Sequence, residues 1–259
     1  MLTLYFSGTG NTAYLAHRFS EQTGARCLSI EEPAAFASII AEHDTIVFCY
    51  PIYGSRPPRN MREFVARHAD ALQGKRVVLF VTQSLFSGDG ARSFLDLLPA
   101  GHVEVVYGEH FRMPNNVSNL WPLYRRQREA KLHACRNRVD TKLTGVCQEI
   151  QDGIEKRRGF SGVSRFLGWL QAKPWLSGGE ALMGRSLNIY HNHCTACGLC
   201  VRLCPTKNLV QQGDTIVPQA SCIVCYRCVN RCPEQAITVF FPQRPKWQYT
   251  SEVFSSETD

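Results

Sequence analysis

The residues with the clearest chemistry are eight cysteines near the end of the sequence, arranged in two copies of one pattern. Each copy has the spacing C-x2-C-x2-C-x3-C followed by proline, first in residues 194–205 and again in residues 222–233. Cysteine thiolates with this spacing hold [4Fe-4S] clusters, and in two-cluster chains the fourth cysteine of each run binds the other cluster. We therefore predict two clusters, the first held by Cys194, Cys197, Cys200 and Cys232 and the second by Cys222, Cys225, Cys228 and Cys204.

The two runs and their flanks resemble a bacterial two-cluster ferredoxin over residues 187–240. A zinc ribbon would need only four ligands, in two C-x2-C pairs, rather than two triplets that are each followed by Cys-Pro. A disulfide framework is typical of short secreted chains, whereas this chain has 259 residues and begins in strand-like sequence without a charged leader. The other four cysteines stand in apolar contexts and are predicted to be small buried hydrophobes: Cys27, Cys49, Cys135 and Cys147.

A second candidate site lies near the beginning of the sequence, where the apolar run Leu2–Phe6 leads into a loop rich in glycine and hydroxyl groups. A helical pattern follows at Ala13–Gln22, with Gly24 as its expected stop. Backbone N–H groups and hydroxyls at a helix start form an anion site, and the absence of lysine favours a phosphomonoester over a triphosphate. The loop resembles the FMN phosphate loop of flavodoxins, which implies FMN binding by Ser7, Gly8, Thr9, Gly10, Asn11 and Thr12.

The flavodoxin resemblance assigns roles to two further loops, each of which follows an apolar run. After Thr45–Tyr50, the loop Pro51, Ile52, Tyr53, Gly54 would cover one face of the flavin, with Tyr53 stacked on the ring. Glycine permits a positive φ, so the Gly54 peptide would be able to flip toward the flavin N5. The alternative is a rigid proline-rich turn with a surface tyrosine.

The loop after Val77–Val81 is similar to one that faces the pyrimidine edge of the flavin in some flavodoxins. The resemblance implies contacts from Thr82, Gln83, Ser87, Gly88, Asp89 and Gly90. Ser87 stands where an aromatic residue is expected, so the second face of the flavin is either open or covered by another part of the chain. The polar turn at residues 112–116 either edges the same site or is a plain connection.

The elements that must position these loops alternate between strands and helices. Apolar strand-like runs at Leu2–Phe6, Arg26–Ile30, Thr45–Tyr50, Val77–Val81 and Val103–Tyr107 enclose helical patterns at Ala13–Gln22, Met61–Leu72 and Ala91–Leu98. This alternation predicts an α/β fold with a doubly wound parallel sheet, and the flavodoxin resemblance implies five strands in the order 2-1-3-4-5. The expected divisions are a flavodoxin-like domain (1–157), a connecting segment (158–186), a small α+β two-cluster ferredoxin domain (187–242) and a tail (243–259).

The positive charge is concentrated in the middle of the chain. Residues 112–190 contain 14 lysine and arginine residues against 6 aspartate and glutamate residues, a net charge of +8. A helix is predicted from Leu123 to Glu155, with an apolar stripe on one side and basic residues on the other. The aromatic segment that follows is expected to pack between the two modules. A nucleic-acid site, a membrane-surface helix and a docking patch for an acidic redox partner are alternatives, and a solvated helix face is the commoner explanation.

Taken together, the chain resembles the flavodoxin–ferredoxin fusion proteins of anaerobes, and this resemblance implies a soluble, cytoplasmic electron-transfer protein that carries FMN and two [4Fe-4S] clusters. Hydrophobic content of 44% is ordinary for such a protein. The sequence contains no run of 18 apolar residues, so no membrane span is predicted. Its partners would be redox proteins rather than nucleic acid, and a homodimer that pairs the cofactors between chains is possible. No side chain is predicted to be catalytic. The rival functions are an FMN-dependent reductase of a small molecule and a redox sensor.

Overall fold

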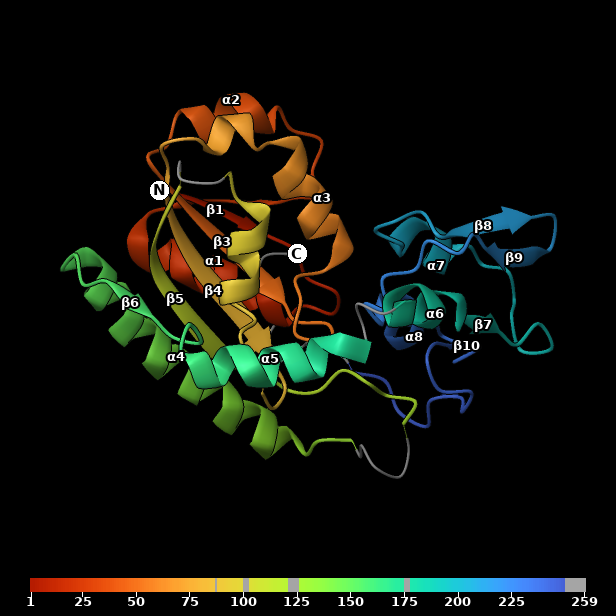
Figure 1. Cartoon of the computed structure of the whole chain (residues 1–259). Coiled ribbons are helices and arrows are strands. Elements are labelled where there is room, and N and C mark those ends of the chain that lie inside the picture. The colour runs from red at the N-terminus through yellow and green to blue at the C-terminus, as the bar shows by residue number, and fades with distance from the viewer. Residues whose placement is uncertain (87, 100–102, 121–125, 175–177, 250–259) are drawn as a thin grey trace.

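The largest element of the fold is a parallel six-stranded sheet, which the computed structural model places in the first two-thirds of the chain (Figure 1). The model describes residues 1–86, 88–99, 103–120, 126–174 and 178–249. The strands are β1 (Leu2–Tyr5), β2 (Arg26–Ser29), β3 (Thr45–Pro51), β4 (Arg76–Gln83), β5 (Glu104–Arg112) and β6 (Lys156–Arg157), in the order β2-β1-β3-β4-β5-β6. The predicted fold class and the order of the first five strands are confirmed.

The predicted count of five strands is wrong by one, because β6 joins the sheet after the long helix. This strand has only two residues and pairs in parallel with Tyr107 and Gly108 of β5. Two residues are too few to show the alternation by which strands are found in a sequence.

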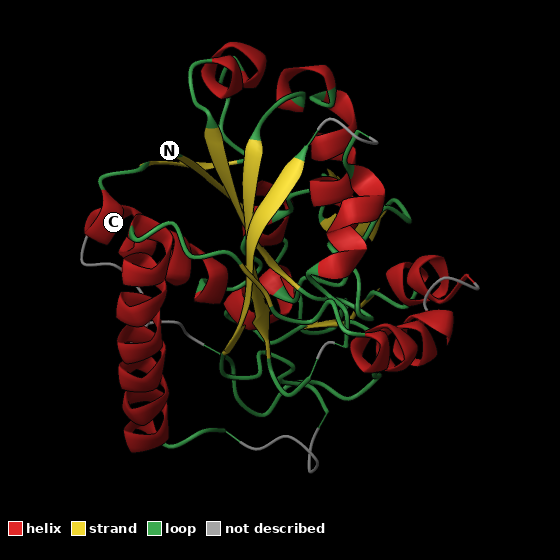
Figure 2. Ribbon diagram, turned by 60° about the vertical axis from the view of Figure 1, so that its left-hand side comes forward, coloured by secondary structure: helices red, strands yellow, loops and turns green. Residues whose placement is uncertain are grey.

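Helices cover both faces of the sheet (Figure 2). One face carries α1 (Asn11–Thr23) and α4 (Glu129–Gln151), and the other carries α2 (Phe36–Ala41), α3 (Arg59–Arg67) and the 3₁₀ helices η1 (Asp70–Leu72) and η2 (Arg92–Leu97). Val47 and Phe48 are neighbours in β3 and belong to opposite cores, as the two-residue period of a strand requires. The sheet is therefore buried on both sides, which explains its continuous apolar strands.

Several helices differ from the predicted ranges. The predicted helix Met61–Leu72 is divided into α3 and η1, because His68 leaves the helical conformation at φ −111°. The predicted helix Ala91–Leu98 is the 3₁₀ helix η2, and α2 was not predicted. The helix predicted from Leu123 is α4, which ends before Gly153, where φ is 72°. Residues 123–125 lie outside the described residues.

The two cysteine runs lie in a small α+β unit that we call the cysteine module (residues 187–242). It contains β7 (Asn188–Ile189), α7 (Leu199–Leu203), β8 (Leu209–Gln212), β9 (Thr215–Pro218), α8 (Arg227–Arg231) and β10 (Ile237–Thr238). The two runs have matching backbones: Ala196 and Val224 have φ of 52° and 58°, and Lys207 and Gln235 have φ of 51° and 49°. A positive φ is unusual for a β-branched residue such as Val224, so the loop around the cysteines imposes it.

The connecting segment forms α5 (Gly162–Pro174) and α6 (Glu180–Arg185), which run between the sheet and the cysteine module (Figure 1). Gln171 accepts a hydrogen bond from Ser55 at 2.6 Å, and Glu180 pairs with Arg62 at 2.6 Å. Ser186, just after α6, accepts a hydrogen bond from the backbone of Phe240 at 2.7 Å. The segment therefore contacts both modules, as predicted. Across the described residues, no helix combines the length and the apolar character that crossing a membrane requires.

Candidate functional site

A cavity of about 490 Å³ lies beyond the carboxyl ends of β1, β3 and β4, and we call it the strand-end cavity. The loops that follow these strands come together there, as expected for parallel strands whose ends meet at one edge of a sheet. Of the predicted flavin residues, those that line the cavity are Ser7, Gly8, Thr9, Asn11, Thr12, Pro51, Ile52, Tyr53, Gly54, Thr82 and Gln83.

The first loop is held in the form of an anion site. Gly10 has a φ of 101° and donates its backbone N–H to the Ser7 hydroxyl at 3.1 Å, while the hydroxyls of Thr12 and Thr82 lie 2.7 Å apart. Within the described part of the chain, no acidic residue lies in the first turn of α1 and no side chain caps it at Gly10. The first N–H groups of α1 therefore remain available to an anion.

The second loop places Tyr53 between the cavity and the cysteine module. Tyr53 and Arg56 exchange backbone hydrogen bonds at 3.0 and 3.1 Å around Gly54 and Ser55, whose φ values are 55° and 60°. The tyrosine ring lines the cavity, whereas its hydroxyl is buried and has no hydrogen-bond partner among the described residues. Burial raises the pKa of Tyr53 well above its ordinary value. Stacking of Tyr53 on a flavin stays a prediction.

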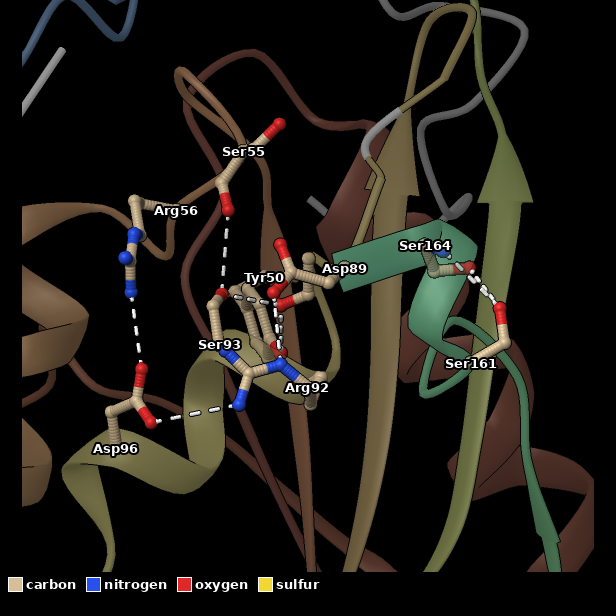
Figure 3. A network of polar contacts seen from close by, with 10 residues as sticks. Tyr50, Ser55, Arg56, Asp89, Arg92, Ser93, Asp96, Ser161 and Ser164 are labelled. Carbon is tan, nitrogen blue, oxygen red and sulfur yellow. Dashed lines mark hydrogen bonds and ion pairs between the residues drawn. The ribbon is translucent and has the colours of Figure 1, made fainter. Parts of the chain in front are cut away.

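The third loop divides between two environments. Thr82 and Gln83 line the cavity, and the side-chain oxygen of Gln83 is buried without a partner in the described structure. The segment 88–90 does not line the cavity: Asp89 is buried and accepts a hydrogen bond from Arg92 at 2.9 Å (Figure 3). Gly88 packs against the backbone of α5 at Gly168. Ser87 lies outside the described residues.

Sequence reasoning missed much of the opposite wall of the cavity. The turn after β5, for which the sequence allowed either an edge of the site or a plain connection, lines the cavity and binds the first loop: Asn116 donates to the Thr9 hydroxyl at 2.9 Å, and Asn11 donates to the Pro114 carbonyl at 3.0 Å. Residues from other parts of the chain also line the cavity, while the covering of a second flavin face stays a prediction. These further lining residues are Leu120, Gln171, Met183, Val224, Tyr226, Phe240 and Phe241.

An FMN-sized ligand fits the chemistry of this cavity. The phosphate would meet the free N–H groups of α1, the isoalloxazine would meet aromatic and apolar walls, and the buried oxygen of Gln83 would accept a hydrogen bond from a ring N–H.

The eight cysteines are brought together in the two predicted groups of four. The first cysteine set lines one small cavity and the second set lines another, each with apolar neighbours such as Ile237 and Leu187. In both sets backbone N–H groups donate to sulfur, from Ala196 to Cys194 at 3.4 Å and from Val224 to Cys222 at 3.3 Å. The sets consist of Cys194, Cys197, Cys200 and Cys232, and of Cys204, Cys222, Cys225 and Cys228.

Burial favours the neutral form of some of these thiols. It raises the pKa of Cys200 to about 11 and that of Cys225 to about 12. Iron binds thiolates, so loading these sets must displace protons from them. The donor set of four sulfurs in an apolar pocket with N–H···S bonds suits a [4Fe-4S] cluster.

The second cysteine set adjoins the strand-end cavity. A Cβ atom at Gly8 would lie 2.5 Å from the carbonyl oxygen of Cys225, so the first loop and this cysteine pack without space for a side chain. Arg227 bridges the same contact and donates to the carbonyls of Ser7 at 2.7 Å and Gly8 at 3.1 Å. The first set lies farther along the module, where the side chain of Cys197 is exposed.

The comparisons with known proteins divide the chain in the same way. Residues 2–110 match a family model described as a flavodoxin domain, and residues 187–209 match one described as a 4Fe-4S binding domain. A ferredoxin of Methanothermococcus thermolithotrophicus is 38% identical over 58 residues, which cover 21% of this chain and 97% of that ferredoxin.

Solved structures similar to the sheet region include flavodoxins and an FMN complex. The two-electron reduced flavodoxin of Megasphaera elsdenii is 26% identical and covers 42% of this chain and 85% of its own, with a TM-score of 0.35. The general stress protein 14 of Treponema denticola, in complex with FMN, is 13% identical and covers 57% and 96%, with a TM-score of 0.42.

Proposed function

Since the chain belongs to the ferredoxin family through its cysteine module and carries a flavodoxin domain before it, we propose that it relays electrons between FMN and two [4Fe-4S] clusters within one chain. The combination of these two domains gives the chain an electron-transfer role. When bound, FMN exchanges one or two electrons and each cluster exchanges one, so the chain would connect one-electron with two-electron carriers.

The strand-end cavity would hold the FMN. Backbone N–H groups and hydroxyls of Ser7–Thr12 would bind its phosphate, while the peptide of Gly54 and the side chain of Gln83 would bind the polar edge of the ring. Tyr53 and Phe241 supply ring-sized apolar surface on the cavity wall. The eight cysteines of the two sets would be the only protein ligands that the two clusters require.

One observation carries the proposal: the strand-end cavity and the second cysteine set share a wall. Val224 lies between Cys222 and Cys225, lines the strand-end cavity and donates its backbone N–H to the Cys222 sulfur at 3.3 Å. Because a single residue touches both sites, the second cluster and the FMN would be neighbours without a second copy of the chain.

The exposure of the two sets suggests where a redox partner approaches. Cys197 of the first set is exposed, whereas Cys225 of the second is buried against the first loop of the sheet domain. A partner protein would therefore reach the first cluster at the surface, and the second cluster would lie between it and the flavin. The reducing cytoplasm would keep the cysteines available for iron.

The rival function, reduction of a small molecule by the flavin, needs an open flavin face. Tyr226 and Phe241 also line the strand-end cavity, so side chains of the cysteine module would cover part of a flavin bound there. We therefore favour the role of an electron carrier.

The proposal is tested by the cofactor content and by the kinetics of electron exchange. Anaerobically purified protein should contain about one FMN and about eight irons per chain. After flash photoreduction, flavin and cluster absorbance should re-equilibrate at a rate that does not change with protein concentration. Cys225→Ser should lower the iron content and slow this exchange, while Cys27→Ser, outside both sets, should change neither. Four irons per chain, or a rate proportional to concentration, would contradict the proposal.

A further inference from the structure

Helix α5 exposes its apolar side. Val163, Phe166, Leu167, Trp169 and Leu170 are exposed by 70, 62, 36, 54 and 53%. Positions 163, 166, 167 and 170 have the spacing that places side chains on one face of a helix, and Trp169 stacks beside Phe166 with ring centroids 6.4 Å apart. In a surface helix the apolar face normally packs on the core, whereas the apolar face of α5 points to solvent.

Close packing fixes this orientation. The buried positions of α5 are the small residues Gly168 and Ala172, and a Cβ atom at Gly168 would collide with the carboxylate of Asp89. Ser161 accepts a hydrogen bond from the backbone of Ser164 at 3.2 Å and so caps the start of the helix next to the Asp89 loop (Figure 3). The helix therefore has no freedom to turn its large apolar side chains inward.

The exposed apolar surface extends beyond the helix. Leu85 and Phe86, exposed by 63 and 51%, precede Gly88, and a Cβ atom at Gly88 would lie 3.2 Å from the backbone of Leu167. We call the combined surface the apolar patch; its members are Leu85, Phe86, Val163, Phe166, Leu167, Trp169 and Leu170. Exposed apolar residues are ordinary when scattered, but several of them on one face of a helix, as on α5, mark a binding surface.

Positive charge surrounds the apolar patch. Helix α5 contains Arg165 and Lys173 and no acidic residue, and the Lys173 ammonium lies 5.3 Å from the centroid of the Trp169 ring. On the other side, Leu85 also lines a basic groove between β5 and α4. Among the described residues, no carboxylate lines this groove, and its cations are Arg112, Lys131, Arg138 and Lys142, of which Lys142 pairs with Glu109 at 2.9 Å.

We propose that the apolar patch and the cations around it bind the surface of a membrane that contains anionic phospholipids. A helix with tryptophan, phenylalanine and leucine on one face and with flanking lysine and arginine lies flat in a membrane interface. The apolar side chains enter the acyl boundary, and the cations meet the lipid phosphates. The exposed apolar side chains of α5 and the Lys173 ammonium beside Trp169 supply both the apolar face and a cation that an anionic lipid surface attracts.

This inference goes beyond the electron-transfer proposal and does not depend on it. It would nevertheless orient the molecule, because Gln171 of α5 lines the strand-end cavity and accepts a hydrogen bond from Ser55 at 2.6 Å. A membrane-bound α5 would place the edge of that cavity close to the lipid surface.

Vesicle flotation tests the inference with the full chain. Anaerobic protein is mixed with vesicles of phosphatidylcholine alone or with about one-third phosphatidylglycerol, because anionic lipids should attract the cations. We expect flotation with the anionic vesicles, reduced by salt. The triple variant Phe166→Ser, Trp169→Ser, Leu170→Ser should partition at least about tenfold more weakly, because three large side chains no longer leave water.

Two controls separate membrane binding from other effects. Leu182→Ser removes a side chain that is 72% exposed on α6, outside the apolar patch, and should float like the unmodified chain. Iron and flavin content, measured on every variant, should stay unchanged. Equal flotation of the triple variant, or no flotation of the unmodified chain, would overturn the proposal. It would also fail if sedimentation without lipid showed a dimer that the triple variant loses, because a second copy would then cover the patch.

Discussion

Replacing Arg227 by alanine removes the main polar connection between the cysteine module and the phosphate loop. The guanidinium donates to the carbonyls of Ser7, Gly8 and Leu203 at 2.7, 3.1 and 3.0 Å, and it pairs with Glu31 at 2.7 Å. Because both loop carbonyls point toward Arg227, their bonds help to hold the loop in the form that leaves its N–H groups free for a phosphate.

The expected cost follows from these contacts. A hydrogen bond from a charged donor contributes about 1.5–3 kcal/mol, and the partly exposed Glu31 pair contributes less because solvent screens it. Because water can bond to the three carbonyls in the variant, loss of the four contacts should lower the free energy of unfolding by about 3–5 kcal/mol, which is less than the sum of the separate bonds. If reordering the loop takes about 1.4 kcal/mol of the FMN binding energy, the affinity for FMN falls about tenfold.

The assay compares Arg227→Ala with Arg231→Ala, a change at an exposed arginine of the same helix. The dissociation constant of FMN comes from quenching of its fluorescence, and stability comes from anaerobic urea unfolding. Iron content should remain unchanged in both variants. If Arg227→Ala binds FMN within twofold of Arg231→Ala and unfolds at the same urea concentration, the bridge does not order the loop and the reasoning is refuted.

Three further predictions concern single residues. Gly8→Ala should weaken FMN binding without loss of iron, because its Cβ would lie 2.5 Å from the Cys225 carbonyl; unchanged affinity in the same titration would contradict this close packing. Tyr53→Phe should leave the FMN-free protein equally stable or more stable by about 1 kcal/mol in urea unfolding, since it removes a buried hydroxyl without a partner in the described structure; a large loss would show a hidden partner. Burial lowers the pKa of His110 to about 4. Its neutral form therefore stabilises the fold fully above pH 6.5, and this contribution is lost as the pH falls toward 4. The free energy of unfolding should be about 1 kcal/mol lower at pH 5.5 than at pH 7.5, and His110→Gln should remove that difference.

The parts of the site that could be predicted are encoded over short stretches. The eight cysteines, the glycine- and hydroxyl-rich loop before α1 and the stop at Gly24, where φ is 67°, each depend on residues close together in the chain. The apolar stripe of α4 likewise follows from helical spacing, and Val139 and Leu143 are buried as that spacing requires. Local chemistry and periodicity are sufficient for such features.

The features that could not be predicted depend on distant partners. Residues 88–90 have the composition of a flavin loop, yet they pack against α5. A side chain at Gly168 of that helix would collide with Asp89. The aromatic segment contacts both modules as expected, yet α5 packs its small residues inward and leaves Trp169 exposed by 54%. A hydrophobic pattern shows which face of a helix is apolar, but it does not show which face finds a surface to pack on.

The sequence by itself determined the chemical groups and the order of the first five strands: eight thiols in two sets, a glycine- and hydroxyl-rich loop, and strands alternating with helices. Only the tertiary structure decided how these parts meet. Gly8 and Cys225 are more than two hundred residues apart, and their contact sets the second cysteine set against the strand-end cavity. Such a contact arises from complementary surfaces formed after folding, and surface complementarity between distant segments leaves no periodic or spacing signal in the chain.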